Sequence, residues 1–230
     1  MPALISSHYE TLKWPDLLQQ DFVEATWLPE LQDRDGDGYD AVLIAETNNT
    51  VRFHIRHKTT GCIAANLVLT FNLTAPSGFP SRLPQVESVY VAADFRAAGL
   101  ATLSYCTLIE HYGALASDTH QTYSGMSMWL NGIAKNPDIE LFIATLEDNN
   151  HPSLRLIDGR PESYIGNRKG LLEAAHTVWH SGRDVQKNIP HFQSLGITLP
   201  SASDSVVILL AKPATTQPAA AHEDWPENGK

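Results

Sequence analysis

Three segments rich in β-branched and aromatic residues follow one another early in the chain, and this run constrains the fold most. They cover residues 39–45, 51–57 and 62–72. Within the second segment, Val51, Phe53 and Ile55 alternate with polar or charged residues, which predicts a strand with one apolar face. The stretch from Lys58 to Gly61 has the length and composition of a hairpin connection. The run therefore predicts consecutive antiparallel strands.

The middle and late parts of the chain alternate strand-like and helix-like segments instead. Strand patterns occur at residues 86–95, 114–116, 139–146 and 206–211, and helical patterns at 99–113 and 123–135. A helix between two successive strands predicts a crossover connection in one sheet. Together with the antiparallel run, this order predicts a single domain of α/β or α+β class over residues 1–212.

Further segments complete the expected organisation. Apolar residues recur at helical spacing in residues 9–31 and predict an N-terminal helix. Residues 74–84 are rich in Pro and Gly and predict a loop. Residues 147–200 form an elaboration that is irregular at first and helical at 171–180. The tail, residues 213–230, is rich in Ala, Pro and Thr and predicts disorder.

The composition excludes several classes of function. The net charge is −10 and no cluster of Lys and Arg occurs, which argues against nucleic acid as a partner. The acidic field favours the approach of a cationic amine. No apolar run reaches the roughly 20 residues of a membrane helix, and no secretory signal is visible. With only two cysteines, Cys62 and Cys106, the chain fits a reducing compartment.

The segment most indicative of function runs from Val89 to Ala101. A predicted strand leads there into a turn of small residues that opens a helix. Small residues let a ligand approach the backbone, and the N–H groups of a first helical turn attract anions. Arg96 adds a cation. The segment predicts a diphosphate-binding turn, and the alternative is a tight strand–helix turn without a ligand.

The pattern Arg96-x-x-Gly99-x-Ala101, placed after an apolar strand and before an amphipathic helix, resembles a signature of the GNAT superfamily of acyl-CoA-dependent N-acetyltransferases. The resemblance covers residues 86–135. It implies a GNAT-like, mostly antiparallel sheet flanked by helices, with acetyl-CoA as co-substrate and no metal. It implies that backbone groups of Val89 and Val91 pair with the pantetheine arm. The implied pyrophosphate ligands are backbone N–H groups of Arg96, Ala97, Ala98, Gly99, Leu100, Ala101 and Thr102.

The same resemblance implies direct attack of a neutral amine on the thioester, so a base must first deprotonate the ammonium. Glu87 is the candidate base, because strand alternation places it on the face of the coenzyme-binding positions. A solvent-exposed or ion-paired carboxylate is the alternative for this residue. A tyrosine often protonates the departing thiolate in this superfamily, but Trp129 stands at that place. His120 and Tyr123 are the candidate substitutes.

The run 117–129 is polar directly after a predicted core strand, at the end of the sheet where ligands tend to bind. Asp118 is the candidate to hold the substrate amine, and a helix cap is the alternative role of its carboxylate. The run is also similar to GNAT-type proteins predicted from bacteriophage genomes. The expected location is therefore the cytoplasm, or the host cytoplasm if the chain is viral.

Two metal-like patterns have simpler explanations. The run Asp33-x-Asp35-x-Asp37 imitates a calcium loop, but Ile44 occupies the position that needs a bidentate glutamate. His176 and His180 lie four residues apart, on what is predicted to be the polar face of a helix. We therefore expect no metal site.

These features predict an N-acetyltransferase that moves an acetyl group from acetyl-CoA to a primary amine of a small molecule or a protein. One alternative is a catalytically altered GNAT-fold protein that acts through protein contacts. Another is an acetyltransferase for an amine-bearing modified nucleobase, which the charge of −10 opposes. No membrane association is expected, and a homodimer is left open.

Overall fold

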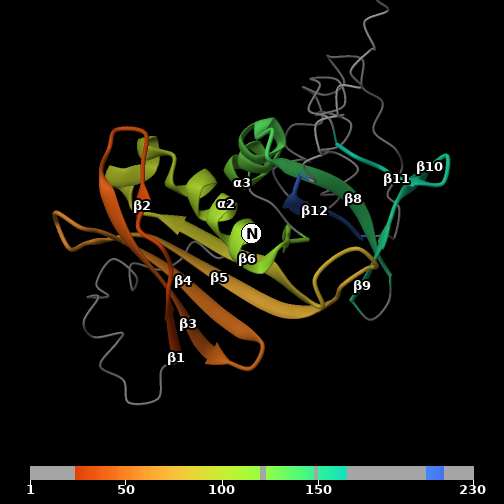
Figure 1. Ribbon diagram of the computed structural model, residues 1–230, viewed down its shortest axis with the longest axis horizontal. Coiled ribbons are helices and arrows are strands. Elements are labelled where there is room, and N and C mark those ends of the chain that lie inside the picture. The colour runs from red at the N-terminus through yellow and green to blue at the C-terminus, as the bar shows by residue number, and fades with distance from the viewer. Residues whose placement is uncertain (1–23, 120–122, 148–149, 165–205, 215–230) are drawn as a thin grey trace, which may run out of the picture.

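The computed structural model describes residues 24–119, 123–147, 150–164 and 206–214, and it shows a mixed α+β protein (Figure 1). A ten-stranded sheet runs in the order β1-β3-β4-β5-β6-β7-β12-β8-β9, and β2 pairs with β3 beside this path. Helices α2 and α3 lie on the same side of the sheet in Figure 1. Among the described residues, no helix has both the length and the apolar character needed to cross a membrane.

The first half of the sheet is antiparallel throughout, as the sequence predicts. Its strands are β1 (Glu24–Trp27), β2 (Leu31–Gln32), β3 (Gly38–Thr47), β4 (Thr50–His57), β5 (Ile63–Thr74) and β6 (Arg82–Val91). The hairpin after β4 closes through hydrogen bonds from the Gly61 N–H to the His57 carbonyl and from the His57 N–H to the Cys62 carbonyl. The loop predicted at residues 74–84 is shorter, because β6 already begins at Arg82.

The helix predicted at residues 9–31 is wrong at its end. Residues 24–27 form β1, which pairs with β3 from Glu24 opposite Ala45 to Trp27 opposite Val42. The edge of β3 provides hydrogen-bond partners for the backbone groups of residues 24–27. The spacing of apolar residues within this segment does not reveal a partner that is distant in the sequence. The remainder of the predicted helix lies outside the described residues.

A crossover connection follows the antiparallel strands. The chain leaves β6 through a 3₁₀ helix, η2 (Ala93–Ala98), enters α2 (Leu100–Tyr112) and returns in β7 (Leu115–Ala116). The predicted strand at 86–95 is thus wrong beyond Val91, since the turn takes its last residues. Gly99 and Gly113 bracket α2 at φ values of 76° and 75°, a region that favours glycine. Strands β6 and β7 run parallel and share one register pair, Gln85 with Ala116.

The last part of the sheet is antiparallel again. Its helical connection is broken into α3 (Tyr123–Ser127), the π-helical turn η3 (Met128–Gly132) and the 3₁₀ turn η4 (Ile133–Lys135). Its strands are β8 (Ile139–Glu147), β9 (His151–Leu154) and β12 (Val206–Pro213), and β10 (Leu156–Ile157) and β11 (Arg160–Pro161) form a separate two-stranded sheet. Strand β12 lies between β7 and β8. The sequence thus predicts a single helix over 123–135 where the structure has three short turns.

The elaboration predicted to begin as an irregular segment contains strands instead. Strand β9 pairs with β8, and β10 and β11 form a two-residue ladder of their own. These strands are two to four residues long, which is too short for an alternating pattern to be visible. The predicted helix at 171–180 and the tail from residue 215 lie outside the described residues.

The main core lies between the sheet and α2. Phe53, Ile55 and Leu67 point from the central strands, and Leu100 and Leu108 from the helix, all fully buried. Burial of each leucine contributes about 2 kcal/mol relative to its exposure to water. Because Leu100 is the first residue of α2, this packing fixes the start of the helix beside the end of β6.

The other face of β4 is buried as well, and it predicts a pH-dependent stability. His54 is 1% exposed, and its Nδ1 lies 2.8 Å from Asn66 Nδ2. Burial, and to a smaller extent the charge of Arg52, lowers the pKa of His54 from 6.5 to about 4. Between about pH 4 and pH 6.5, the folded state therefore binds fewer protons than the unfolded state. The contribution of neutral His54 to the free energy of unfolding is complete above about pH 6.5 and is lost as the pH falls toward 4.

We expect acidification from about pH 7.5 to about pH 4 to cost about 3 kcal/mol through this histidine alone. Urea unfolding of wild type and His54→Gln at both pH values measures the difference. The variant should lose less stability than wild type over the interval, by about that amount. Equal losses in the two proteins would show that His54 does not titrate in this way.

Candidate functional site

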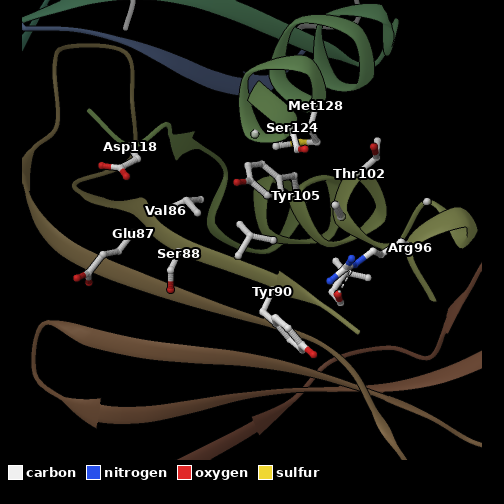
Figure 2. Close-up of a pocket in the computed structure, with 15 residues that line it drawn as sticks. Val86, Glu87, Ser88, Tyr90, Arg96, Thr102, Tyr105, Asp118, Ser124 and Met128 are labelled. Atoms are coloured by element: carbon white, nitrogen blue, oxygen red, sulfur yellow. Dashed lines mark hydrogen bonds between the residues drawn. The ribbon is translucent and has the colours of Figure 1, made fainter. Parts of the chain in front are cut away.

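A cavity of about 520 Å³ lies beside the point where β6 and β7 separate. One wall is β6 from Val86 to Val91, and the opposite wall is the start of α2. Asp118, which follows β7, and residues of α3 close the remaining side (Figure 2). The structure thus brings together residues from three separate parts of the chain around one cavity.

Among the described residues, β7 pairs with β6 on the cavity side only at Gln85, so the edge of β6 beyond it carries backbone groups that no described strand takes. The Ala92 N–H donates to the Ala64 carbonyl at 2.9 Å, so Ala92 is turned toward β5. Backbone direction alternates along a strand, so Val89 and Val91 direct their N–H and carbonyl groups the other way. Arg96 Nε donates to the Val91 carbonyl at 3.2 Å, in agreement with this orientation. An extended ligand could pair with this edge.

The start of α2 offers N–H groups to an anion. Gly99 is the N-cap and supplies no side-chain cap, and the Leu103 N–H makes the first helical bond, to the Gly99 carbonyl at 3.1 Å. The N–H groups of residues 100–102 precede that bond and have no acceptor within the helix. The positive end of the helix dipole adds to their attraction for negative charge.

The predicted phosphate-binding residues divide into two groups. Arg96, Gly99, Ala101 and Thr102 line the cavity. Leu100 points its side chain into the core, so only its backbone could serve a ligand. Ala98 packs against the core, and the side chain of Ala97 lies outside the part of the chain that the structure describes.

Sequence reasoning missed Tyr105, the most enclosed polar side chain of the cavity wall. It is 1% exposed and lines the cavity from α2, and Figure 2 shows its hydroxyl directed toward the side that holds Asp118. Burial, with a further contribution from the charge of Asp118, raises the pKa of Tyr105 above its ordinary value. The hydroxyl therefore stays protonated across the neutral pH range. Its position four residues after Ala101 was the available signal, because such residues share a helix face.

Trp129, which stands where a tyrosine acid was expected, is a packing residue. It is fully buried in η3, and its ring packs edge-on against Tyr105 with centroids 5.2 Å apart. The indole thus supports the tyrosine that does face the cavity. Of the two predicted substitutes, His120 lies outside the described residues, and only the backbone of Tyr123 is described.

Simple strand alternation, from which Glu87 was predicted to share a face with Val89 and Val91, does not hold at Glu87, because β6 contains a bulge. Ser88 pairs with Val68 and Val86 pairs with Leu69, so Glu87 has no residue opposite it in β5. The extra residue interrupts the alternation, and backbone bulges are not visible in residue patterns. Glu87 nevertheless lines the cavity as an exposed side chain, and its charge acts on Arg52.

Asp118 lies in the cavity wall. Its Oδ1 accepts a hydrogen bond from the Thr119 N–H at 2.6 Å. The alternative role as a helix cap concerns residues 120–122, which lie outside the described residues. In Figure 2, Asp118 and Glu87 lie at one end of the cavity and Arg96 lies at the other. The cavity can therefore hold an anion at one end and a cation at the other.

The acidic turn before β3, residues 33–37, is held together by hydrogen bonds to the carboxylate of Asp33. Asp33 Oδ1 accepts the N–H groups of Asp35 and Asp37, and Asp33 Oδ2 accepts the Tyr39 hydroxyl at 2.7 Å. The described ranges contain no group of three or more potential metal ligands, and His176 and His180 lie outside them.

Comparison with protein-family models, with curated proteins and with solved structures gave no match. The assignment of a function therefore depends on the geometry and chemistry of the cavity.

Proposed function

We propose that the protein is an N-acyltransferase that moves an acetyl group from acetyl-CoA to a primary amine. One observation carries the proposal: a single cavity joins an open strand edge, an uncapped helix N-terminus and a buried tyrosine. An acyl-CoA has three matching parts, namely a diphosphate, an amide-bearing arm and, at the far end of that arm, a thioester. The parallel pair β6 and β7, which separates after one register pair, supports a GNAT-like arrangement.

The coenzyme would lie along β6. Its amides would pair with Val89 and Val91 as an added strand does, through main-chain hydrogen bonds. Its diphosphate would accept hydrogen bonds from the N–H groups of Ala101 and Thr102, with Arg96 as a neighbouring cation. The acyl end would then reach the part of the cavity that holds Tyr105 and Asp118.

The acceptor amine would enter at the acidic end. Asp118 and Glu87 would attract the ammonium. Glu87, which is exposed at the cavity, would accept a proton from the ammonium and pass it to water. The amine nitrogen then attacks the thioester carbonyl carbon and forms the carbon–nitrogen bond. The nitrogen loses its surplus proton to solvent, and the carbon–sulfur bond breaks to release the thiolate. We assign Tyr105 as the group that protonates this thiolate, in place of the predicted His120 and Tyr123. The products are an amide and coenzyme A.

Calorimetric titration with acetyl-CoA, followed by a thiol-release assay with a panel of primary amines, tests the proposal. We expect binding in the micromolar range, about 1 to 100 μM, and thiol release with at least one amine. Absence of acetyl-CoA binding would overturn the proposal. Binding without thiol release would favour the alternative, a GNAT-fold protein that acts through protein contacts, which the buried Trp129 at the expected acid position favours.

A further inference from the structure

We propose that Arg34, in the acidic turn before β3, is a second cation for the phosphate groups of the ligand bound at the start of α2. The inference rests on the proposed function and adds a residue that lies outside the phosphate-binding segment of the sequence. A Cβ atom built on Gly99 would lie 4.0 Å from Arg34 Nε, and this is its nearest contact. Gly99 therefore has the guanidinium of Arg34 as its neighbour.

The turn that carries Arg34 is held in one conformation. The carboxylate of Asp33 accepts hydrogen bonds from the N–H groups of Asp35 and Asp37, at 3.0 and 2.9 Å, and from the hydroxyl of Tyr39. These bonds lower the pKa of Asp33, with the Tyr39 hydroxyl as the largest cause. The turn therefore presents Arg34 from a fixed backbone.

An aromatic cluster joins this turn to the phosphate-binding turn. Tyr39 packs edge-on against Phe95 of η2, with ring centroids 6.2 Å apart. His57 contacts both rings, at 5.3 Å from Tyr39 and 5.2 Å from Phe95. Tyr39 is fully buried and His57 is nearly so. The turn that carries Arg34 and the turn before α2 are thus connected through the packed rings of Tyr39, His57 and Phe95. This packing sets the position of one turn relative to the other.

The guanidinium of Arg34 is not taken by the carboxylates around it. Three aspartates lie within three residues of it, yet the described part of the chain contains no ion pair of Arg34. Arg96, which lines the cavity near Gly99, donates to a backbone carbonyl and likewise has no ion pair there. The two arginines are therefore both available to an anion.

The charge of the expected ligand explains why a second cation is needed. The N-terminus of a helix contributes about half a positive charge, and Arg96 contributes one more. A diphosphate ester carries about two negative charges, and a further phosphate monoester adds about two more. The chain as a whole carries −10, which opposes the approach of such a ligand. The site is also more than a helix end, because the nearly fully buried Tyr105 lines the same cavity.

Binding of coenzyme A and of inorganic diphosphate to Arg34→Gln and Arg34→Lys tests the inference. We expect Arg34→Gln to weaken binding of coenzyme A about tenfold, with a shallower dependence on salt concentration. Arg34→Lys should lose less, because it keeps the charge but not the planar pair of donors. Arg160→Gln is the matched control, since Arg160 is also exposed but lies in β11 and is not a neighbour of Gly99.

Unchanged affinity of Arg34→Gln for both probes would overturn the inference. The proposed acyl transfer is judged separately, by thiol release from acetyl-CoA. Arg34-dependent binding of inorganic diphosphate without thiol release would keep the phosphate site and reject the enzyme. Thiol release with an Arg34-independent affinity for coenzyme A would keep the enzyme and reject the role of Arg34.

Discussion

Replacing Tyr105 by phenylalanine should lower kcat for acetyl transfer about a hundredfold while leaving the KM for acetyl-CoA nearly unchanged. A positioned acid contributes roughly this factor to a step in which a leaving group must be protonated. The ring of Tyr105 stays in place in the variant, so its edge-on contact with Trp129 is kept. Steady-state kinetics with acetyl-CoA and the best amine of the panel measures both constants.

The raised pKa of Tyr105 predicts the pH dependence of kcat. Burial and the charge of Asp118 raise the pKa of Tyr105, so the hydroxyl remains a proton donor well above neutral pH. Wild-type kcat should therefore show no loss from this group up to about pH 9, and the variant should lose activity at every pH.

Tyr112→Phe is the matched control for this substitution. Tyr112 lies on the same helix, packs edge-on against Phe71 with centroids 5.4 Å apart, and lines no part of the cavity. It should keep wild-type kcat. A Tyr105→Phe enzyme that keeps wild-type kcat as well would remove Tyr105 from the mechanism.

The sequence predicts those parts of the fold that depend on local patterns. The helix at 99–113 agrees with α2 within one residue at each end, because glycine marks both boundaries. The strands at 51–57 and 206–211 also agree closely, since each has a long run of strand-forming residues. The same locality explains why the sequence places Gly99, Ala101 and Thr102 together: they lie within four successive residues at the start of one helix.

The features that were missed depend on partners far away in the sequence. Strand β1 owes its conformation to pairing with β3, and the bulge at Glu87 appears only in the register between β5 and β6. Arg34 reaches Gly99 across 65 positions through the packing of Tyr39 on Phe95. No spacing rule connects such residues, so only the three-dimensional structure reveals them.

The largest effect on binding is expected for Gly99→Glu, which should weaken acetyl-CoA at least about a hundredfold. The substitution places a carboxylate at the start of α2, where the proposed diphosphate would lie. Two like charges brought next to each other in a binding site weaken the binding free energy by several kcal/mol. The new carboxylate would also pair with Arg34, whose Nε would lie 4.0 Å from its Cβ, and so remove a second cation from the ligand. Calorimetry with acetyl-CoA measures the loss.

Two controls separate charge from backbone strain. Gly99 has φ of 76°, so any side chain there costs about 1 kcal/mol of stability. Gly99→Gln introduces the same strain and shape without the charge and should retain most of the affinity that Gly99→Glu loses. Gly61→Glu adds a carboxylate at φ of 70° in the hairpin after β4, where no atom lies within 4 Å of the new Cβ, and should bind as wild type does. If Gly99→Glu binds acetyl-CoA as tightly as Gly61→Glu, no phosphate group is bound at the start of α2, because a ligand anion there could not coexist with the new carboxylate.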